Sequence, residues 1–111
     1  MIALRELKSV EDFHTFIGSE GNELHIVKLS APWCNPCRVL GETIKNLDKE
    51  RIGNALFAEI DIDTDETEEV GVECGVRGVP VLIYYKGGKE VKRTTGVVPA
   101  EEIYNTIKEL S

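Results

Sequence analysis

The sequence predicts an α/β fold in which a central mixed five-stranded sheet is flanked by four helices, with a single layer of helices on each face. The chain has 111 residues, 41% hydrophobic and 30% charged, a length and balance that suit a single domain over residues 1–111. Early in the chain, strand-like apolar runs alternate with helical segments, which indicates parallel strands covered by helices. A glycine pair between two late strand-like runs adds an antiparallel hairpin.

The first half of the chain supplies three strands and two helices. Residues 2–6 are expected to form a short edge strand, and residues 9–12 (Ser-Val-Glu-Asp) then resemble a capping box that begins a helix. Residues 24–31 are rich in strand formers, and the helix after them begins at the Cys34-Asn35-Pro36-Cys37 segment. Residues 55–62 form a near-continuous apolar run, which is typical of an interior strand.

The second half supplies the remaining elements. Residues 63–74 indicate a short acidic helix, and residues 80–86 are the strongest strand signal in the chain. Gly87-Gly88 predicts a two-residue turn, after which residues 89–95 return antiparallel. Pro99 suits the first turn of a final helix.

Charge and composition exclude two classes of partner. The formal net charge of −7 argues against nucleic-acid binding, which requires a basic surface. No stretch approaches the roughly 20 apolar residues of a membrane-spanning helix. The N-terminal residues carry charges at Arg5, Glu6 and Lys8 and lack the apolar run of a signal peptide, so we expect a cytoplasmic protein. We also expect a monomer.

Two cysteines separated by two residues lie where a strand gives way to a helix, in the segment Trp33-Cys34-Asn35-Pro36-Cys37. A helix N-terminus carries partial positive charge and free N–H groups, which favour a thiolate at the first cysteine and lower its pKa. A thiolate is the nucleophile of disulfide exchange. The second sulfur lies about one helical turn further on, so it can reach the first and resolve a mixed disulfide.

A Cys-x-x-Cys pair is also half of some zinc sites, which need two further ligands. The remaining candidates are Cys74, His14 and His25, and none of them forms a second close pair. Proline within the pair and a helix directly after it favour redox chemistry. We therefore expect no metal, and no cofactor other than a redox-active Cys34–Cys37 disulfide.

Three segments resemble the thioredoxin family. WCNPCR at residues 33–38 is similar to the WCGPCK signature, and RGVPVLIYYKGG at residues 77–88 is similar to the family segment that carries a cis-proline. TTGVV at residues 94–98 is similar to the family glycine segment near the last helix. The resemblance extends over about residues 2–110. It implies the thioredoxin fold and the activity of a protein disulfide reductase.

The resemblance also implies roles for individual residues. Cys34 would attack a substrate disulfide, and the more buried Cys37 would resolve the mixed disulfide. The Val79–Pro80 bond would be cis, although the residues alone indicate an ordinary trans proline at a strand start. Disulfide-containing proteins would be the substrates, and a thioredoxin reductase would supply electrons. The substrate surface would comprise Trp33, Asn35, Pro36, Val79, Pro80 and Gly96.

Other functions of this fold stay open at this point. An oxidant or isomerase is one alternative, but oxidising relatives often carry His at the position of Pro36. Trp33 and Pro36 also disfavour a glutathione-dependent, glutaredoxin-like role. A binding module that only docks partners is the alternative from another class, and the presence of both cysteines argues against it.

Two charged residues depart from the family pattern. Thioredoxins usually have a buried Asp six residues before the first cysteine and a Lys near it on the adjacent strand, and here Lys28 and Glu59 occupy those positions. Because an unpaired buried charge is costly, we predict that Lys28 and Glu59 face each other. The pair is then the candidate for proton transfer, with Glu59 acting towards Cys37. Alternatively, both side chains reach solvent and have no role.

Two further features are assigned no site. Cys74 is either a half-buried small apolar residue or a regulatory, dimer-forming thiol. Asp61, Asp63 and Asp65 imitate the start of a calcium loop, but Glu66 stands where such a loop requires glycine, so we predict no calcium binding.

Overall fold

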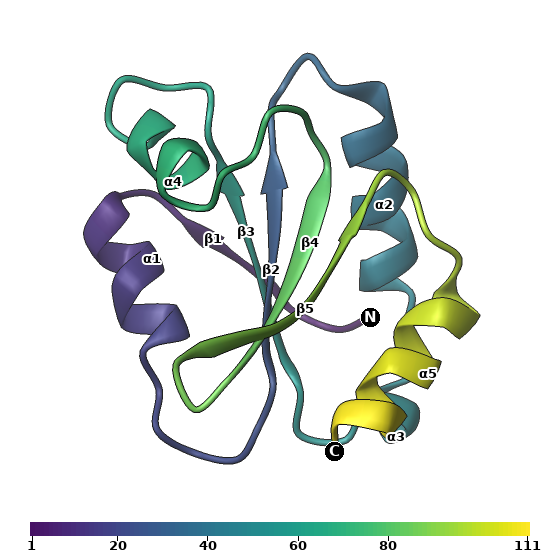
Figure 1. Cartoon of the computed structure of the whole chain (residues 1–111). Coiled ribbons are helices and arrows are strands. Elements are labelled where there is room, and N and C mark those ends of the chain that lie inside the picture. The colour runs from purple at the N-terminus through teal and green to yellow at the C-terminus, as the bar shows by residue number, and fades with distance from the viewer.

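Five strands and five helices make up the chain, and the computed structural model describes residues 1–111. The sheet order is β1-β3-β2-β4-β5, in which β1, β3 and β2 run parallel and β4 and β5 are antiparallel to their neighbours. This confirms the predicted mixed α/β sheet (Figure 1). In chain order the elements are β1 (Leu4–Leu7), α1 (Val10–Ile17), β2 (His25–Ser30), α2 (Asn35–Lys45), α3 (Lys49–Ile52), β3 (Leu56–Asp61), α4 (Glu68–Glu73), β4 (Val81–Lys86), β5 (Lys89–Thr95) and α5 (Ala100–Leu110).

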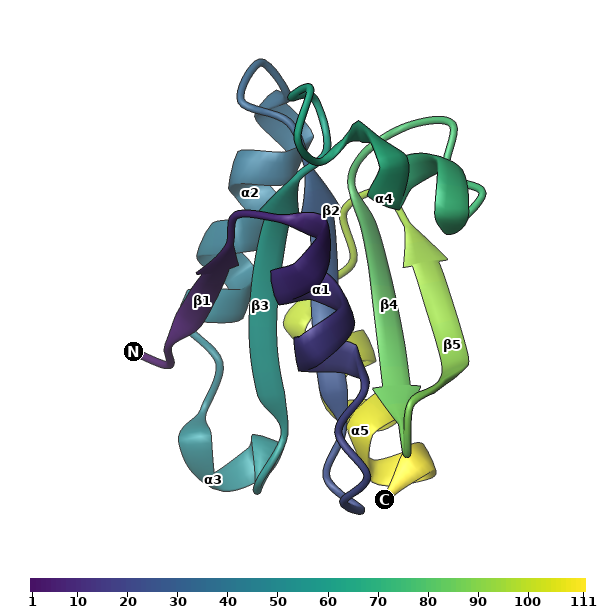
Figure 2. The same cartoon turned by 90° about the vertical axis from the view of Figure 1, so that its left-hand side faces the viewer.

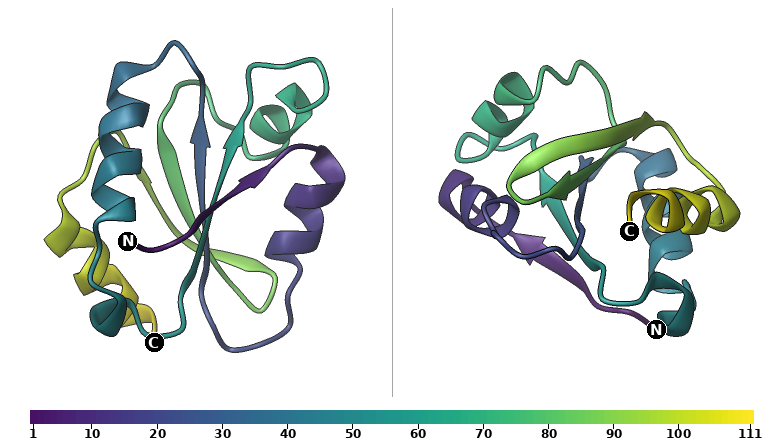
Figure 3. Two further views of the ribbon diagram at one scale, coloured as in Figure 1. Left: turned by 180° about the vertical axis from the view of Figure 1, so that it is seen from behind. Right: turned by 60° about the horizontal axis from the view of Figure 1, so that its bottom comes forward.

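The helices form one layer on each face of the sheet. Helices α1 and α4 cover one face, while α2, α3 and α5 lie on the other (Figures 1 and 2). Each layer encloses its own apolar core, one built around Phe13 and Val70 and the other around Leu40 and Ile103. The views from behind and from below show the same two layers, with the C-terminal end of α5 close to α3 (Figure 3). None of the helices is long and apolar enough to span a membrane.

The prediction of four helices was wrong by one, because α3 was missed. This helix is a single turn over Lys49–Ile52, capped by Asp48, whose carboxylate accepts a hydrogen bond of 2.9 Å from the Glu50 N–H. Only Ile52 of its four residues is buried, in the core shared with α2 and α5. One turn is too short for an apolar period of 3.6 residues to be visible in the sequence.

Helix α1 begins where predicted, with one difference in its cap. Ser9 Oγ accepts a hydrogen bond of 2.9 Å from the Asp12 N–H, as in a capping box. The Asp12 carboxylate, however, accepts from the N–H of Lys8 at 3.0 Å rather than from the N–H of Ser9. The cap therefore also holds the residue that links β1 to α1.

The acidic helix is shorter than predicted, because α4 begins only at Glu68. Residues 63–67 form turns instead, in which Thr67 Oγ1 donates to the carbonyl of Asp61 and the Thr67 N–H donates to Thr64 Oγ1 at 3.1 Å. Threonine side chains that bond to nearby backbone compete with helix formation in this way. The turns keep Asp61 and Asp63 at the end of β3.

Side chains alternate strictly across the central strands, which explains a lysine within the apolar strand β2. Val27 and Leu29 belong to the core under α1 and α4, whereas Ile26 belongs to the core under α2 and α5. The period of two therefore directs Lys28 towards α2. The parallel register places Lys28 beside Glu59 of β3.

Candidate active site

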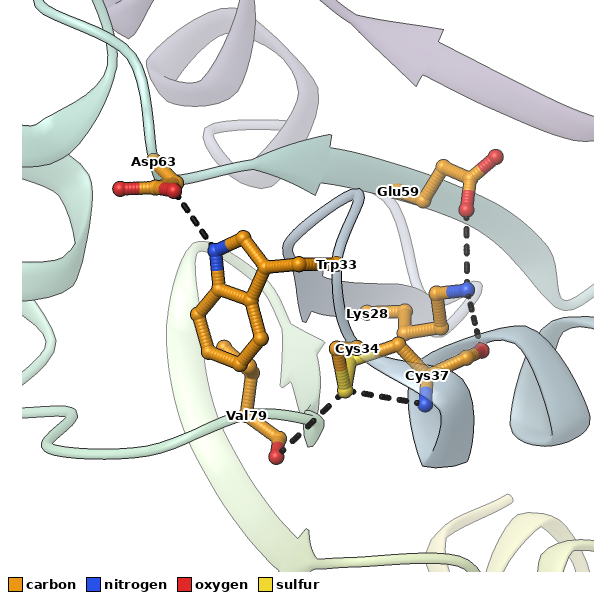
Figure 4. Close-up of a disulfide and its surroundings, with 7 residues drawn as sticks. All are labelled: Lys28, Trp33, Cys34, Cys37, Glu59, Asp63 and Val79. Carbon is orange, nitrogen blue, oxygen red and sulfur yellow. Dashed lines mark hydrogen bonds and ion pairs between the residues drawn. A yellow bond between two sulfur atoms is a disulfide. The ribbon is translucent and has the colours of Figure 1, made fainter.

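The two cysteines lie at the N-terminal end of α2, directly after β2 leaves the sheet. Cys34 is the N-cap residue of α2 and Cys37 occupies its first turn, and the two are joined by a disulfide with a Cα–Cα distance of 5.3 Å (Figure 4). Both cysteines are buried, with 6% of Cys34 and 1% of Cys37 exposed. A substrate that approaches this site therefore meets Cys34 first.

Cys34 Sγ occupies the place of an N-cap side-chain acceptor. It accepts a hydrogen bond of 3.1 Å from the Cys37 N–H, one of the backbone donors that a helix N-terminus leaves unpaired. It also lies 3.8 Å from the carbonyl oxygen of Val79. In the reduced protein, the same N–H and the helix dipole favour negative charge on this sulfur. The geometry is suited to a thiolate nucleophile at Cys34.

The segment that faces Cys34 lies directly before β4, the antiparallel neighbour of β2. The Val79–Pro80 peptide bond is cis, as the resemblance implies. Gly96, directly after β5, donates its N–H to the carbonyl of Pro80 at 2.9 Å and has a φ of +79°, which favours glycine. The pairing of β4 with β5 thus brings Pro80 and Gly96 together, and Val79 reaches Cys34.

Trp33 forms an exposed rim beside the cysteines. The residue is 72% exposed, yet its indole Nε1–H donates a hydrogen bond of 2.7 Å to Asp63 Oδ2 (Figure 4). Asn35 and Pro36 are exposed on the first turn of α2. A small hollow of about 180 Å³ lies next to the ring, lined by Ala31, Trp33, Ile62, Asp63, Val76, Arg77, Gly78 and Val79.

Sequence reasoning missed the role of Asp63, which it considered only as part of a false calcium loop. The signal that could have found it is topological. Asp63 and Trp33 follow the ends of two adjacent parallel strands, β3 and β2, and such ends meet at the same edge of a sheet.

Lys28 is buried beneath the cysteines and is paired. The whole residue is 3% exposed, and its Nζ donates a hydrogen bond of 2.8 Å to the carbonyl oxygen of Cys37. The same Nζ lies 3.0 Å from Glu59 Oε1, so the contact predicted between Lys28 and Glu59 is present (Figure 4). The alternative that both side chains reach solvent is wrong for Lys28, while the side chain of Glu59 is 31% exposed.

A glycine of α2 makes room for the lysine. A Cβ atom on Gly41 would lie 2.8 Å from Lys28 Nζ, which is closer than Cβ atoms in proteins approach atoms of another residue, so the lysine would have to shift. Gly41 is buried and lies one helical turn after Cys37. Sequence reasoning did not connect Gly41 with Lys28, because the two meet only when α2 packs on β2.

The other candidate ligands and thiols lie apart from the pair. His14 Nε2 contacts Glu73 at 2.8 Å, and the ring of His25 contacts the carbonyl of Glu23. No group of three or more His, Cys, Asp and Glu residues is arranged to hold a metal ion. Cys74 is half-buried with Sγ 3.8 Å from the Tyr85 hydroxyl, and burial raises the pKa of its thiol.

The chain is similar to thioredoxins along almost its whole length. The family model described as Thioredoxin matches residues 5–109. Thioredoxin-2 of Saccharomyces cerevisiae is 37% identical over 95 residues, which cover 86% of this chain and 88% of the yeast protein. Thioredoxin of Gallus gallus is 31% identical over 107 residues, covering 96% of this chain and 98% of the chicken protein. The X-ray structure of Fasciola hepatica thioredoxin matches with a TM-score of 0.82 at 29% identity, covering 97% of this chain and all of that one.

Proposed function

The chain belongs to the thioredoxin family of thiol–disulfide oxidoreductases, and we propose that Cys34 and Cys37 carry out its reduction of protein disulfides in two different roles. Cys34 is the attacking thiol and Cys37 is the resolving thiol. The observation that carries the assignment is the 3.1 Å hydrogen bond from the Cys37 N–H to Cys34 Sγ at the start of α2. Only the first sulfur receives this stabilisation of negative charge.

The reaction transfers two electrons in two exchange steps. The Cys34 thiolate attacks one sulfur of the substrate disulfide, forming a mixed disulfide and releasing the other substrate sulfur as a thiolate that takes up a proton. Cys37 then gives up its proton and attacks Cys34 Sγ, which releases the second substrate thiol. The substrate is reduced and the protein is left with the Cys34–Cys37 disulfide. The pair itself is the redox group, and no further cofactor takes part.

The proton of Cys37 leaves through the buried ion pair. Lys28 contacts the backbone of Cys37 and also Glu59, whose carboxylate is partly open to solvent. Glu59 acts as the proton acceptor that activates Cys37 for the resolving step. The test is the rate of disulfide reduction by Glu59→Gln across a range of pH. We expect the variant to lose the part of the rate that depends on ionisation of Glu59, and an unchanged rate at every pH would contradict the role.

Substrate proteins dock on the surface that surrounds Cys34. An extended segment next to the substrate disulfide pairs with the backbone of Val79, and Trp33 supplies an apolar rim. The small hollow beside Trp33 supports this placement because it adjoins the loop that carries Val79. The docking surface comprises Trp33, Asn35, Pro36, Val79, Pro80 and Gly96.

The cycle runs in the cytoplasm, where the protein acts as a monomeric electron carrier. Disulfide-containing proteins are the substrates, and a thioredoxin reductase returns the pair to the dithiol. The similarity to thioredoxins supports both partners. The reductase is tested by following NADPH consumption with a purified thioredoxin reductase and insulin, and absence of turnover with functional reductases would contradict that partner.

The two cysteine roles are tested by trapping. Wild-type protein should reduce insulin disulfides in the presence of dithiothreitol, and Cys34→Ser should abolish thiol-dependent turnover. Cys37→Ser should accumulate a stable mixed disulfide with the substrate, because nothing releases the captured sulfur. Cys74→Ser is the matched control and should behave as wild type. A mixed disulfide trapped by Cys34→Ser but not by Cys37→Ser would reverse the assignment, and a protein that only docks would show no turnover.

A further inference from the structure

A buried positive charge contacts the backbone of the second cysteine. Lys28 Nζ donates to the Cys37 carbonyl at 2.8 Å, and its side chain is only 4% exposed. Glu59 reaches the same Nζ from the adjacent strand at 3.0 Å, but its own side chain is 31% exposed. The ammonium is therefore shielded from water next to the cysteine, whereas water screens the carboxylate further away.

The surroundings of Lys28 contain no other ionic group that would cancel this charge. From β3 the residue paired with it is Glu59, and from β4 it is the apolar Leu82. From α2 it meets the Cys37 backbone and Gly41, whose missing side chain leaves room for the ammonium, since a Cβ atom there would lie 2.8 Å from Nζ. The fold thus holds the ammonium against the first turn of α2 and leaves it a single counter-charge.

The two redox states of the cysteine pair respond differently to a nearby cation. The disulfide is uncharged, whereas the reduced pair carries a thiolate at the helix start. A nearby opposite charge favours the ionised form of a thiol and lowers its pKa, and each pKa unit is a factor of about ten in the equilibrium. Stabilising the thiolate stabilises the reduced form and makes the disulfide a stronger oxidant.

We propose that Lys28 is a positioning residue that stabilises the dithiol form of the Cys34–Cys37 pair, so that the pair is more oxidising than the same fold with its two buried charges interchanged. The inference rests on the proposed function for the identity of the redox pair. Lys28 would influence the redox equilibrium through its charge and through its hydrogen bond to the Cys37 carbonyl, and not through contact with substrate.

The test is the equilibrium of the full chain with glutathione. Oxidised glutathione takes two electrons from the dithiol, which gives two reduced glutathione molecules and the Cys34–Cys37 disulfide. Lys28→Glu with Glu59→Lys keeps an ion pair but buries the negative charge. We expect the equilibrium constant for oxidation to rise about tenfold or more, which lowers the reduction potential by about 30 mV per factor of ten. The ultraviolet absorbance of the thiolate should appear at higher pH than in the wild type.

Two further variants keep the test decisive if the interchanged pair does not fold. Lys28→Met with Glu59→Gln removes both charges, and Gly41→Ala keeps both charges but displaces Nζ from the Cys37 carbonyl. Both should shift the equilibrium in the same direction, by a smaller factor. Interchange of the exposed pair Arg51–Glu101, at the other end of the α2–α5 face, is the control and should leave the equilibrium unchanged.

An equilibrium constant within twofold of wild type in every folded variant, or a shift towards the dithiol, would overturn the inference. The readout is separate from the proposed function. If wild-type protein fails to reduce insulin, the substrate assignment fails while the comparison of glutathione equilibria still decides the role of Lys28.

Discussion

Trp33 and Asp63 are joined by a 2.7 Å hydrogen bond between the indole N–H and the carboxylate, although Trp33 is 72% exposed. The bond joins the loop after β2 to the loop after β3. Asp63 is itself fixed, because its N–H donates to Asp61 Oδ1 at 2.8 Å. An exposed aromatic ring is thus held in one orientation beside Cys34, which lowers the entropy lost when a substrate docks against it.

Replacing Asp63 should therefore weaken the docking of protein substrates without changing the thiol chemistry. For Asp63→Ala we expect kcat/KM for insulin reduction to fall about threefold to tenfold, since a typical hydrogen bond contributes a net of about 0.5–1.5 kcal/mol. Reduction of a small disulfide, which has little surface to place on Trp33, should stay at the wild-type rate. The control is Asp65→Ala, an exposed acidic residue two positions further on. An equal loss for both kinds of substrate would contradict the docking role.

The Lys28–Glu59 pair should respond unequally to removal of its two members. Glu59→Gln leaves a buried ammonium without a counter-charge and should lower the free energy of unfolding by about 3 kcal/mol or more. Lys28→Met leaves a carboxylate that is 31% exposed and can be hydrated, so its cost should be smaller, about 1 kcal/mol. The double variant Lys28→Met, Glu59→Gln should recover most of the loss. Urea unfolding of the oxidised protein gives the free energy of unfolding of all three variants. Equal losses of stability in the two single variants would show that the Lys28 charge is no more costly to leave unpaired than the Glu59 charge.

Gly96 should be intolerant of a side chain for a backbone reason. Its φ of +79° costs an ordinary residue about 1–2 kcal/mol, and it also supplies the N–H that holds the Pro80 carbonyl. We expect Gly96→Ala to lose about that amount of stability. Gly78, on the other side of Val79–Pro80, has no positive φ, and no atom lies within 4 Å of the place that a Cβ would occupy, so Gly78→Ala should be nearly neutral. The comparison is made by thermal or urea unfolding, and equal stabilities of the two variants would contradict the strain at Gly96.

Cys74 should react slowly with alkylating reagents. Burial is the main cause that raises its pKa, so little thiolate is present at neutral pH, while the contact with the Tyr85 hydroxyl opposes the shift. In oxidised protein, where Cys74 is the one free cysteine, we expect iodoacetamide to react at less than about a tenth of its rate with the unfolded chain. The reactivity should increase as the pH rises towards the raised pKa. A covalent dimer on mild oxidation that Cys74→Ser abolishes would instead support the regulatory alternative.

Most of the fold was predictable because its signals are local. The strand over residues 89–95 matched its observed bounds, and the helix capped by Ser9 began where predicted. These elements show their apolar period, cap or turn within a few residues. The two local errors have the same kind of cause, since α3 is shorter than one full apolar period and Thr67 diverts its backbone into turns before α4.

The sequence by itself determined the chemistry: two cysteines one helical turn apart at the start of a helix, and a charged pair that had to be buried together or not at all. Only the tertiary structure decided what surrounds them. Asp63 holds Trp33, Gly41 admits Lys28, and Gly96 holds Pro80, although each pair is separated by 13 or more residues along the chain. The physical reason is that these contacts arise from the order and register of strands and from the packing of α2 on the sheet. A contact between residues far apart in sequence leaves no periodic trace in either segment.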